Sequence, residues 1–429
     1  MPGTTTNLAE TLKYAYGVKK VQYMFNTESP TYKALSKVKK PLGGRGQFII
    51  PTVVQNGGAF TGITEGGALP STLAPDAAEA TFSLQEYVGI YDITWKLIQD
   101  SAGDKFAFQQ AVQMMNDGLE NRILRNLNSD LLDNGKGRLA VLSAADNDTV
   151  LTVNALPRCE TGMVCDVMDL TDDDTKIGDS RTINGTDPIG RTVTISGAAL
   201  SGTAAGDYFV IQDTTDVTSQ SPAYHSNGWL SVVSNANPAA VVGNYGGLSR
   251  ATAGNEYWQA VLLQGSPAGT NRALTEDVLL QAQDAVREKG GGKINAWFSN
   301  LAILRRYHEI MASERYLALS KPGVISGGIG RKGAGEDAED GLTPYEFSGV
   351  PWHVDPFFNA NVVIGANMDH FFLGVGDNEV PRPISEVFDN IPFFRQTSSA
   401  TFEVAWYFQM EFMSDNPSAG VQIQDVAES

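Results

Sequence analysis

Cysteine and histidine are scarce in this chain of 429 residues. The two cysteines, Cys159 and Cys165, have the spacing of neither a zinc ribbon nor a Cys-x-x-Cys redox pair. We expect free thiols, with a local disulfide as the alternative. The four histidines occur in no His-Glu-x-x-His motif, and no serine lies in a nucleophile elbow. The sequence therefore predicts no catalytic residue, no metal site and no cofactor.

Long apolar runs and positive charge are also lacking. No run reaches the roughly 18–20 apolar residues that span a bilayer, and the first residues lack the regions of a secretory signal. We expect no membrane partner and synthesis in the cytoplasm. The net charge is −18, and no basic patch for gripping phosphates stands out. Solubility explains this charge, and a surface that faces DNA without adhering to it is the sharper alternative.

The few lysines are unevenly placed. Several lie in 7–42, among apolar residues, which predicts an arm with one or two short helices. From Gly46 to Trp95 there is no Lys or Arg. Strands are predicted at 48–54 and 81–95, and the segment between them is rich in glycine and proline. Such a long connection predicts a hairpin that projects and lies on another surface, with disorder as the alternative.

A long amphipathic helix is predicted from Asp104 to about Leu132. Its apolar residues recur at steps of three and four: Phe108, Val112, Met115, Leu119, Ile123, Leu127 and Leu131. At 1.5 Å per residue this helix spans roughly 40 Å. Gly118 lies in its middle and permits either bending or close packing against a neighbour.

The remainder alternates between β-rich and mixed segments. Residues 138–250 lose helical periodicity and predict a β-rich module, in which the run Asp172–Asp174 favours a solvated turn over a cation site. Thr275 is predicted to cap a helix that ends before Gly290. A helix over 300–311 follows, and the strands predicted around it lie at 294–298, 350–354, 362–364 and 371–373.

The strongest pattern in the chain is at its C-terminal end. Apolar residues occupy every second position from Phe402 to Phe412, which predicts a strand with one continuous apolar face. The opposite face, with Glu403, Gln409 and Glu411, is expected to meet solvent or polar neighbours. We expect this strand to pair with material far upstream. A second short strand is predicted at 421–423.

Two further motifs do not qualify as sites. Residues 328–333 match G-x-G-x-x-G, but neither a strand before nor a helix after it is predicted, so we expect no nucleotide there. His353 and Asp355 share a strand face, yet no third metal ligand is evident. Each histidine is expected to be structural.

The order of these elements resembles the major capsid proteins of tailed bacteriophages with the HK97 fold, which is an α+β fold. The resemblance also includes a Gly/Asn/Asp turn at 132–137 and the sequence Gly349-Val350-Pro351-Trp352 before a strand. It implies the following division: an N-terminal arm (1–45), an E-loop with flanking P-domain strands (46–99), a spine helix (100–137), an inserted β-rich domain (138–250), an A-domain (251–376) and a C-terminal return to the P-domain (377–429).

The resemblance implies a structural, non-catalytic function in the virion. Many copies would form pentamers and hexamers of an icosahedral shell around double-stranded DNA, without reading its sequence, after assembly in the bacterial cytoplasm. It implies inter-subunit contacts by the E-loop through Phe60, Ile63, Glu65 and Leu69, and contacts by the arm through Tyr16, Tyr23, Phe25 and Tyr32. Gly118 would act as a hinge of the spine helix during shell expansion.

The sequence departs from the family pattern in three ways. The E-loop holds no lysine for a covalent crosslink, so none is expected. The arm begins almost at once, which favours a separate scaffolding protein; a portal and decoration proteins are further expected partners. The β-rich range 138–250 is an inserted domain, which is expected on the outer surface. The alternatives are an encapsulin-type compartment with the same fold, a β-rich tail or carbohydrate-binding protein, and, less favoured, an enzyme.

Overall fold

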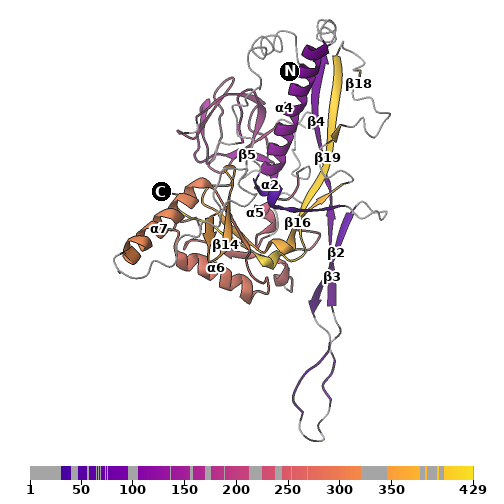
Figure 1. The fold of residues 1–429 in the computed structure, drawn as a ribbon, viewed down its shortest axis with the longest axis vertical. Helices are drawn as coiled ribbons and strands as arrows, with labels where there is room; N and C mark the ends of the chain where they lie inside the picture. The colour runs from indigo at the N-terminus through magenta and orange to yellow at the C-terminus, as the bar shows by residue number, and fades with distance from the viewer. Residues whose placement is uncertain are drawn as a thin grey trace.

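A computed structural model describes most of the chain. The described residues are 30–39, 47–55, 58–63, 65, 67, 69–72, 74, 76–94, 105–135, 137–154, 158–169, 175–187, 189–211, 225–236, 244–252, 254–267, 269–319, 345–376, 382–383, 394–395 and 401–428. They form two sheets, a β-barrel, a projecting hairpin and a long helix (Figure 1).

The strand β19 (Thr401–Ser414) is the centre of a six-stranded sheet, here called the β19 sheet. One of its edges pairs antiparallel with β4 (Gln85–Thr94), which lies more than 300 residues upstream in the sequence. In this pairing Met410 lies opposite Gln85. Its other edge pairs in succession with β16 (Phe371–Val375), β17 (Arg382–Pro383) and β18 (Phe394–Arg395), and β1 (Ser36–Lys39) runs parallel to β16. The predicted long-range pairing of the terminal strand is confirmed.

The helix α4 (Lys105–Leu131) lies along this sheet. A Cβ added to Gly89 of β4 would clash with Ile123 of α4, so a residue without a side chain allows the helix and strand to approach closely. Leu127 and Leu131 of the predicted stripe are buried, and Ile123 is half-buried. The short helix α2 (Pro30–Ala34) packs against α4.

The projecting hairpin consists of β2 (Gln47–Gln55) and β3 (Asp76–Ser83), paired antiparallel, with a loop between them whose described residues are 58–63, 65, 67, 69–72 and 74. Figure 1 shows this loop, here called the projecting loop, extending away from the rest of the molecule. The single strand predicted over 81–95 is instead two strands, β3 and β4, separated at Leu84. The chain changes sheets at this break, because β3 pairs with β2 and β4 pairs with β19.

The second sheet is called the β15 sheet. Its strands, in spatial order, are β11 (Val261–Leu263), β20 (Gly420–Ile423), β15 (Val363–Ala366), β12 (Ala296–Ser299), β14 (Val350–Val354) and β13 (Tyr345–Phe347). The helices α6 (Glu276–Glu288) and α7 (Leu301–Leu319) belong to this part. The predicted cap of α6 is confirmed, since Thr275 accepts a hydrogen bond from Val278 N. The α7 helix continues to Leu319, beyond the end predicted at 311.

The sheets do not follow the predicted ranges. β20 lies within 377–429, the predicted return to the P-domain, and it pairs with β11 and β15 of the second sheet. Conversely, β16 lies within 251–376, yet it pairs with β19 of the first sheet. The two sheets are therefore linked by chain crossing in both directions.

The described residues between 138 and 211 form a β-barrel. Its strands, in spatial order, are β5 (Arg138–Val141), β10 (Tyr208–Ile211), β7 (Val164–Met168), β8 (Arg181–Asp187), β9 (Thr192–Ile195) and β6 (Val150–Thr152). Backbone hydrogen bonds from Ser143 N to Thr152 O (2.9 Å) and from Asn154 N to Val141 O (2.8 Å) join the end strands and close the barrel. The barrel has an apolar core of its own, which contains the two free thiols.

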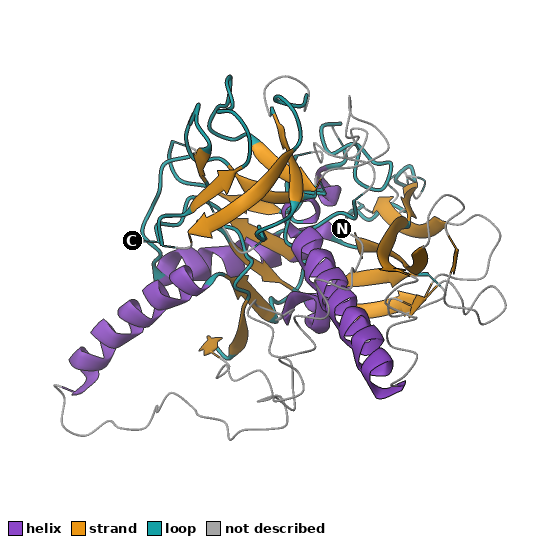
Figure 2. Ribbon diagram, turned by 90° about the horizontal axis from the view of Figure 1, so that it is seen from above, coloured by secondary structure: helices purple, strands orange, loops and turns teal. Residues whose placement is uncertain are grey.

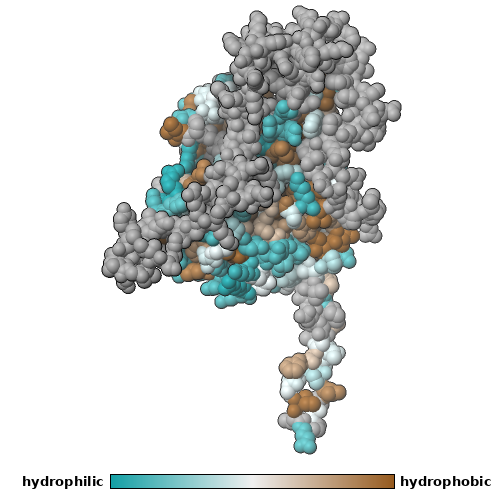
Figure 3. All heavy atoms as spheres, in the orientation of Figure 1, coloured by the Kyte–Doolittle hydropathy of each residue, from teal (hydrophilic) through white to brown (hydrophobic). Residues whose placement is uncertain are grey.

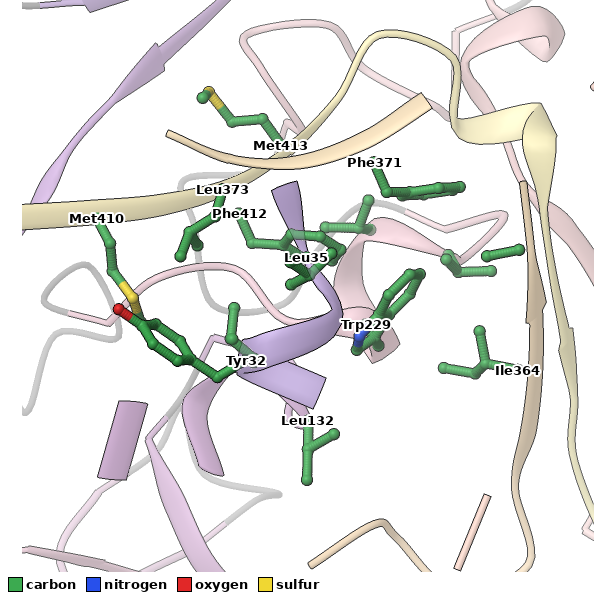
Figure 4. Packing of buried hydrophobic residues seen from close by; sticks show 14 of the residues in the cluster. Tyr32, Leu35, Leu132, Trp229, Ile364, Phe371, Leu373, Met410, Phe412 and Met413 are labelled. Carbon is green, nitrogen blue, oxygen red and sulfur yellow. The ribbon is translucent and has the colours of Figure 1, made fainter. Parts of the chain in front are cut away.

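The predicted β-rich range ended at 250, but the barrel ends at Ile211. Beyond it, Trp229 of α5 (Trp229–Val232), Val232, Val233 and Tyr245 pack in the main core instead. The centroid of the Trp229 ring lies 4.8 Å from that of Phe412, 5.1 Å from that of Phe371 and 5.2 Å from that of Phe298. Trp229 therefore contacts strands of both sheets. Figure 4 shows this core around Trp229. The described part of the chain also contains short 3₁₀ helices at Glu256–Trp258, Met368–His370 and Pro417–Ala419.

Candidate assembly surface

The projecting loop carries large apolar side chains that the rest of the subunit does not cover. Phe60 is fully exposed, Leu69 is 84% exposed and Ile63 is 54% exposed. Glu65 is exposed as well. Figure 3 shows hydrophobic residues along this extension, below the body of the molecule. Large apolar side chains on an extended segment are typical of a surface that becomes buried against a partner.

A free-standing hairpin gains little stability from its own pairing. Here β2 and β3 are held at their base, because Phe48 and Phe82 are buried in the main core. Tyr245 packs edge-on against Phe82 with the ring centroids 5.0 Å apart. The body therefore anchors the hairpin at one end and leaves the loop at the other end exposed.

Of the four arm residues predicted to contact a neighbour, only Tyr32 is described. Tyr32 is 4% exposed and lies in the core of its own chain, so the prediction of an inter-subunit contact is wrong for this residue. Burial raises the pKa of its phenol to about 12. Tyr16, Tyr23 and Phe25 lie outside the described residues.

The arm is fixed at this point by a buried polar network. Thr31 Oγ1 donates to Asp355 Oδ2 (2.7 Å), and Tyr32 N donates to Asn128 Oδ1 (3.0 Å). Asn128 Nδ2 in turn donates to Asp355 Oδ2 (2.9 Å). The network joins α2, α4 and the loop after β14, and its three side chains from Thr31, Asn128 and Asp355 are almost completely buried.

Gly118 lies in α4, where the sequence placed it. A Cβ added at Gly118 would meet nothing within 4 Å among the described residues of its own subunit, so packing inside the subunit does not require a glycine here. Its role as a hinge stays a prediction.

Glu411 of β19 is buried, although it belongs to the face expected to carry polar contacts. Its Oε1 accepts hydrogen bonds from Asn227 Nδ2 (2.6 Å) and Asn227 N (3.2 Å), so a polar neighbour is present as predicted. Its Oε2 has no hydrogen-bond partner within the described part of the chain. Burial raises the pKa of Glu411 to about 8, in spite of the two bonds from Asn227.

The histidines do not form a metal site with one another. The His353 ring stacks on Phe298 with the ring centroids 5.2 Å apart, and burial lowers its pKa, while Asp355 belongs to the network of Thr31 and Asn128. Across the described ranges, no group of three or more His, Cys, Asp or Glu residues is placed to hold a metal ion. The motif at 328–333 and the run Asp172–Asp174 lie outside the described residues.

Sequence reasoning missed two features of this molecule. The Asp355 network joins segments over 200 positions apart, and no local pattern indicates it. Residues 225–233 had a usable signal, because Trp229, Val232 and Val233 form a short apolar cluster in a polar region. That cluster predicts burial, although it lies inside the range 138–250 that is predicted to be a β-rich module.

Comparison with solved structures identifies the architecture. The chain is similar to a chain of the cyanophage A-1(L) capsid asymmetric unit, with a TM-score of 0.55 and 14% identity, over 95% of this chain and 96% of that chain. It also matches the capsid of a native GTA particle (TM-score 0.44, 12% identity, 98% of this chain and 99% of that one). A third match is the holo-SrpI encapsulin complex from Synechococcus elongatus (TM-score 0.46, 8% identity, 97% of this chain and 96% of that one).

We draw nothing from the second and third matches, because their TM-scores are low. No protein-family model matches the sequence, and a search of curated proteins finds no match. In the described part of the chain, no helix combines the length and apolar character that crossing a bilayer requires. The cyanophage capsid match, together with the hairpin, the long helix and the two sheets, establishes that this chain has an HK97-like capsid fold.

Proposed function

We propose that this protein is the major capsid protein of a tailed bacteriophage. Copies assemble into pentamers and hexamers of an icosahedral shell, in the bacterial cytoplasm, and the shell encloses double-stranded DNA in the virion. The function is structural and requires no catalysis. A net charge of −18 supports a shell that encloses DNA without gripping its phosphates.

The exposure of Phe60, Ile63 and Leu69 on the projecting loop carries this proposal. Fully burying one such side chain contributes about 1.5–3 kcal/mol, before the costs of association are subtracted. A contact repeated at every subunit therefore makes assembly favourable even when each single contact is weak. Glu65 and these three residues form the inter-subunit contact of the projecting loop, and Tyr16, Tyr23 and Phe25 form that of the arm.

Further partners follow from the same proposal. A separate scaffolding protein directs assembly, a portal occupies one vertex, and decoration proteins bind the outside. The barrel of residues 138–211 is an insertion into the shell fold and lies on the outer surface. Its own apolar core supports this division, since the barrel buries its own side chains independently of the main core.

Electron microscopy of the purified protein tests the proposal. We expect the wild-type chain, expressed with its scaffolding protein if needed, to form closed particles hundreds of ångströms across. Phe60→Asp should abolish these particles while the subunit stays folded by circular dichroism, because a carboxylate at this contact is costly to bury.

Ile189→Asp is the matched control, since Ile189 is 96% exposed but lies on a turn of the barrel. This variant should still form particles. If the wild-type protein remains a small soluble oligomer, or if Phe60→Asp assembles as well as Ile189→Asp does, the proposal is wrong.

A further inference from the structure

The barrel is bound to α4 on one of its sides. Arg125 of α4 forms an ion pair with Glu160 of the barrel, and the Arg125 side chain is 4% exposed. Just after α4, Asp133 Oδ1 accepts a 2.8 Å hydrogen bond from Nε of Arg138, the first residue of β5. Burial alone would raise the pKa of the Asp133 carboxyl, but Arg138 lowers it overall, as expected for a charge held by a fixed partner.

The barrel is also bound to the part of the molecule that contains the β15 sheet. Arg158 donates from Nη1 to Arg138 O (3.0 Å) and from Nη2 to Phe357 O (3.1 Å). Arg191 pairs with Glu428, with Nη2 2.9 Å from Oε2. The other carboxylate oxygen of Glu428 accepts from Asn300 Nδ2 (2.5 Å), immediately before α7.

The third pair of parts, α4 and the β15 sheet, is joined directly. Asn128 Nδ2 donates to Asp355 Oδ2 (2.9 Å), and Asn359 Nδ2 donates to Leu132 O (2.9 Å). Both bonds lie near the C-terminal end of α4, where Leu127 and Leu131 also share the main core with Phe298 and Ile364 of the β15 sheet. The direct contacts between these two parts are therefore gathered at one end of the helix. A third body bound to both parts limits their rotation about this end.

We propose that the barrel is a brace that fixes the angle between α4 and the β15 sheet. In Figure 1 the barrel, marked by β5, lies beside α4 and above β14 and α7, which belong to the two parts that it would join. Figure 2 shows the molecule from above, with two long helices that point away from each other and strands around them. The brace acts on the single subunit. Its consequence for the curvature of a shell rests on the proposed function.

The two outer ties of the brace differ in strength. Arg191 is 51% exposed, so solvent screens its ion pair with Glu428 and a small contribution is expected. Arg125 is buried, and removal of Glu160 leaves a buried cation without this partner, which is more costly. Loss of Glu160 should therefore loosen the barrel more than loss of Glu428, and loss of both should loosen it most.

Distances between spin labels test the brace on the unassembled subunit. Labels at Glu120→Cys on α4 and Glu288→Cys on α6 occupy exposed positions. The native thiols of Cys159 and Cys165 should stay unlabelled, because both are buried and burial raises their pKa to about 12. We expect one narrow distance distribution in the labelled wild-type background. Glu160→Ala combined with Glu428→Ala should broaden the distribution or add a second population.

Glu309→Ala is the matched control, because it breaks the ion pair of Glu309 with Arg306 inside α7 and touches no part of the brace. Its distribution should stay narrow. Glu160→Ala alone, which removes the stronger of the two ties, supplies a second variant if the double variant does not fold. A folded double variant, or the folded Glu160→Ala variant in its place, that keeps the wild-type distribution overturns the brace.

Particle diameters separate this inference from the proposed function. The wild-type protein should give particles of one diameter, and the double variant should give a wider range. If the wild-type protein forms no particles, the proposed function fails while the label distances still decide the brace. If the distances broaden and the diameter is unchanged, the brace stands and its link to curvature is overturned.

Discussion

The side-chain amide of Asn128, in the last turn of α4, donates a 2.9 Å hydrogen bond to Asp355, 227 positions further along the chain. Asp355 also accepts from Thr31 Oγ1 and from Phe357 N. A carboxyl group that is 1% exposed is stabilised only if such donors surround it. This one group therefore links the arm, the long helix and the β15 sheet.

Thr31→Val should destabilise the subunit. The substitution keeps the shape of the side chain but removes the hydroxyl that donates to Asp355, which costs about 1–3 kcal/mol for a buried acceptor. Thr31→Ser is the control, because it retains the hydroxyl and loses only a methyl group. Urea denaturation of the unassembled subunits measures both. Equal losses in the two variants would show that the hydrogen bond contributes nothing beyond packing.

The buried Glu411 should make stability depend on pH. Its pKa is about 8 in the folded protein and near the ordinary 4.5 in the unfolded chain. Between these values the unfolded chain releases the proton while the folded protein keeps it. The free energy of unfolding therefore decreases as pH rises through this window, by about 1.4 kcal/mol per pH unit.

Glu411→Gln should remove this slope, because its amide cannot titrate and its oxygen still accepts from Asn227. The variant should be more stable than the wild-type protein near pH 8. Glu79→Gln, at an exposed position of β3, is the control and should leave the slope unchanged. Denaturation curves from pH 5 to pH 9 make the comparison. An unchanged slope in Glu411→Gln would assign the pH dependence to other groups.

Local signals predicted the elements well, since they act within a few residues. The alternation from Phe402 to Phe412 predicted β19, and the three- and four-residue steps predicted α4. Thr275 predicted the start of α6 because a cap bonds only to its own first turn. The same signals do not indicate which sheet a strand joins, as β16 and β20 illustrate.

Burial on the second face of a strand is also beyond a local pattern. Glu411 alternates with Met410 and Phe412 and so belongs to the polar face, but residues 226–227 cover it. Exposure of the projecting loop was predictable because its composition offers no core. The burial of Tyr32 was not predictable, since an aromatic residue in an arm can pack on a neighbouring subunit as well as in the core of its own subunit.

Gly228→Ala should be one of the most damaging single changes in the main core. A Cβ at this position would overlap the carbonyl oxygens of Asp130 and Asp133 at the end of α4, and neither backbone atom can move freely. Overpacking against backbone costs about 3 kcal/mol. Gly185→Ala is the control, because its Cβ would meet nothing within 4 Å. Thermal unfolding distinguishes them, and equal melting temperatures would refute this account of Gly228.

Gly118→Ala should stabilise α4 by about 1 kcal/mol, because alanine has the higher helix propensity and its Cβ has space. The unassembled subunit should therefore resist urea more strongly than the wild-type subunit. If Gly118 is also a hinge, this variant should assemble into particles that fail to expand as DNA fills them. Asp117→Ala is the matched neighbour, since it raises the helix propensity of an exposed position and leaves the glycine in place. Particles of Asp117→Ala should expand normally. Normal expansion in both variants, measured as particle diameter by electron microscopy, would leave Gly118 a stability effect and exclude the hinge.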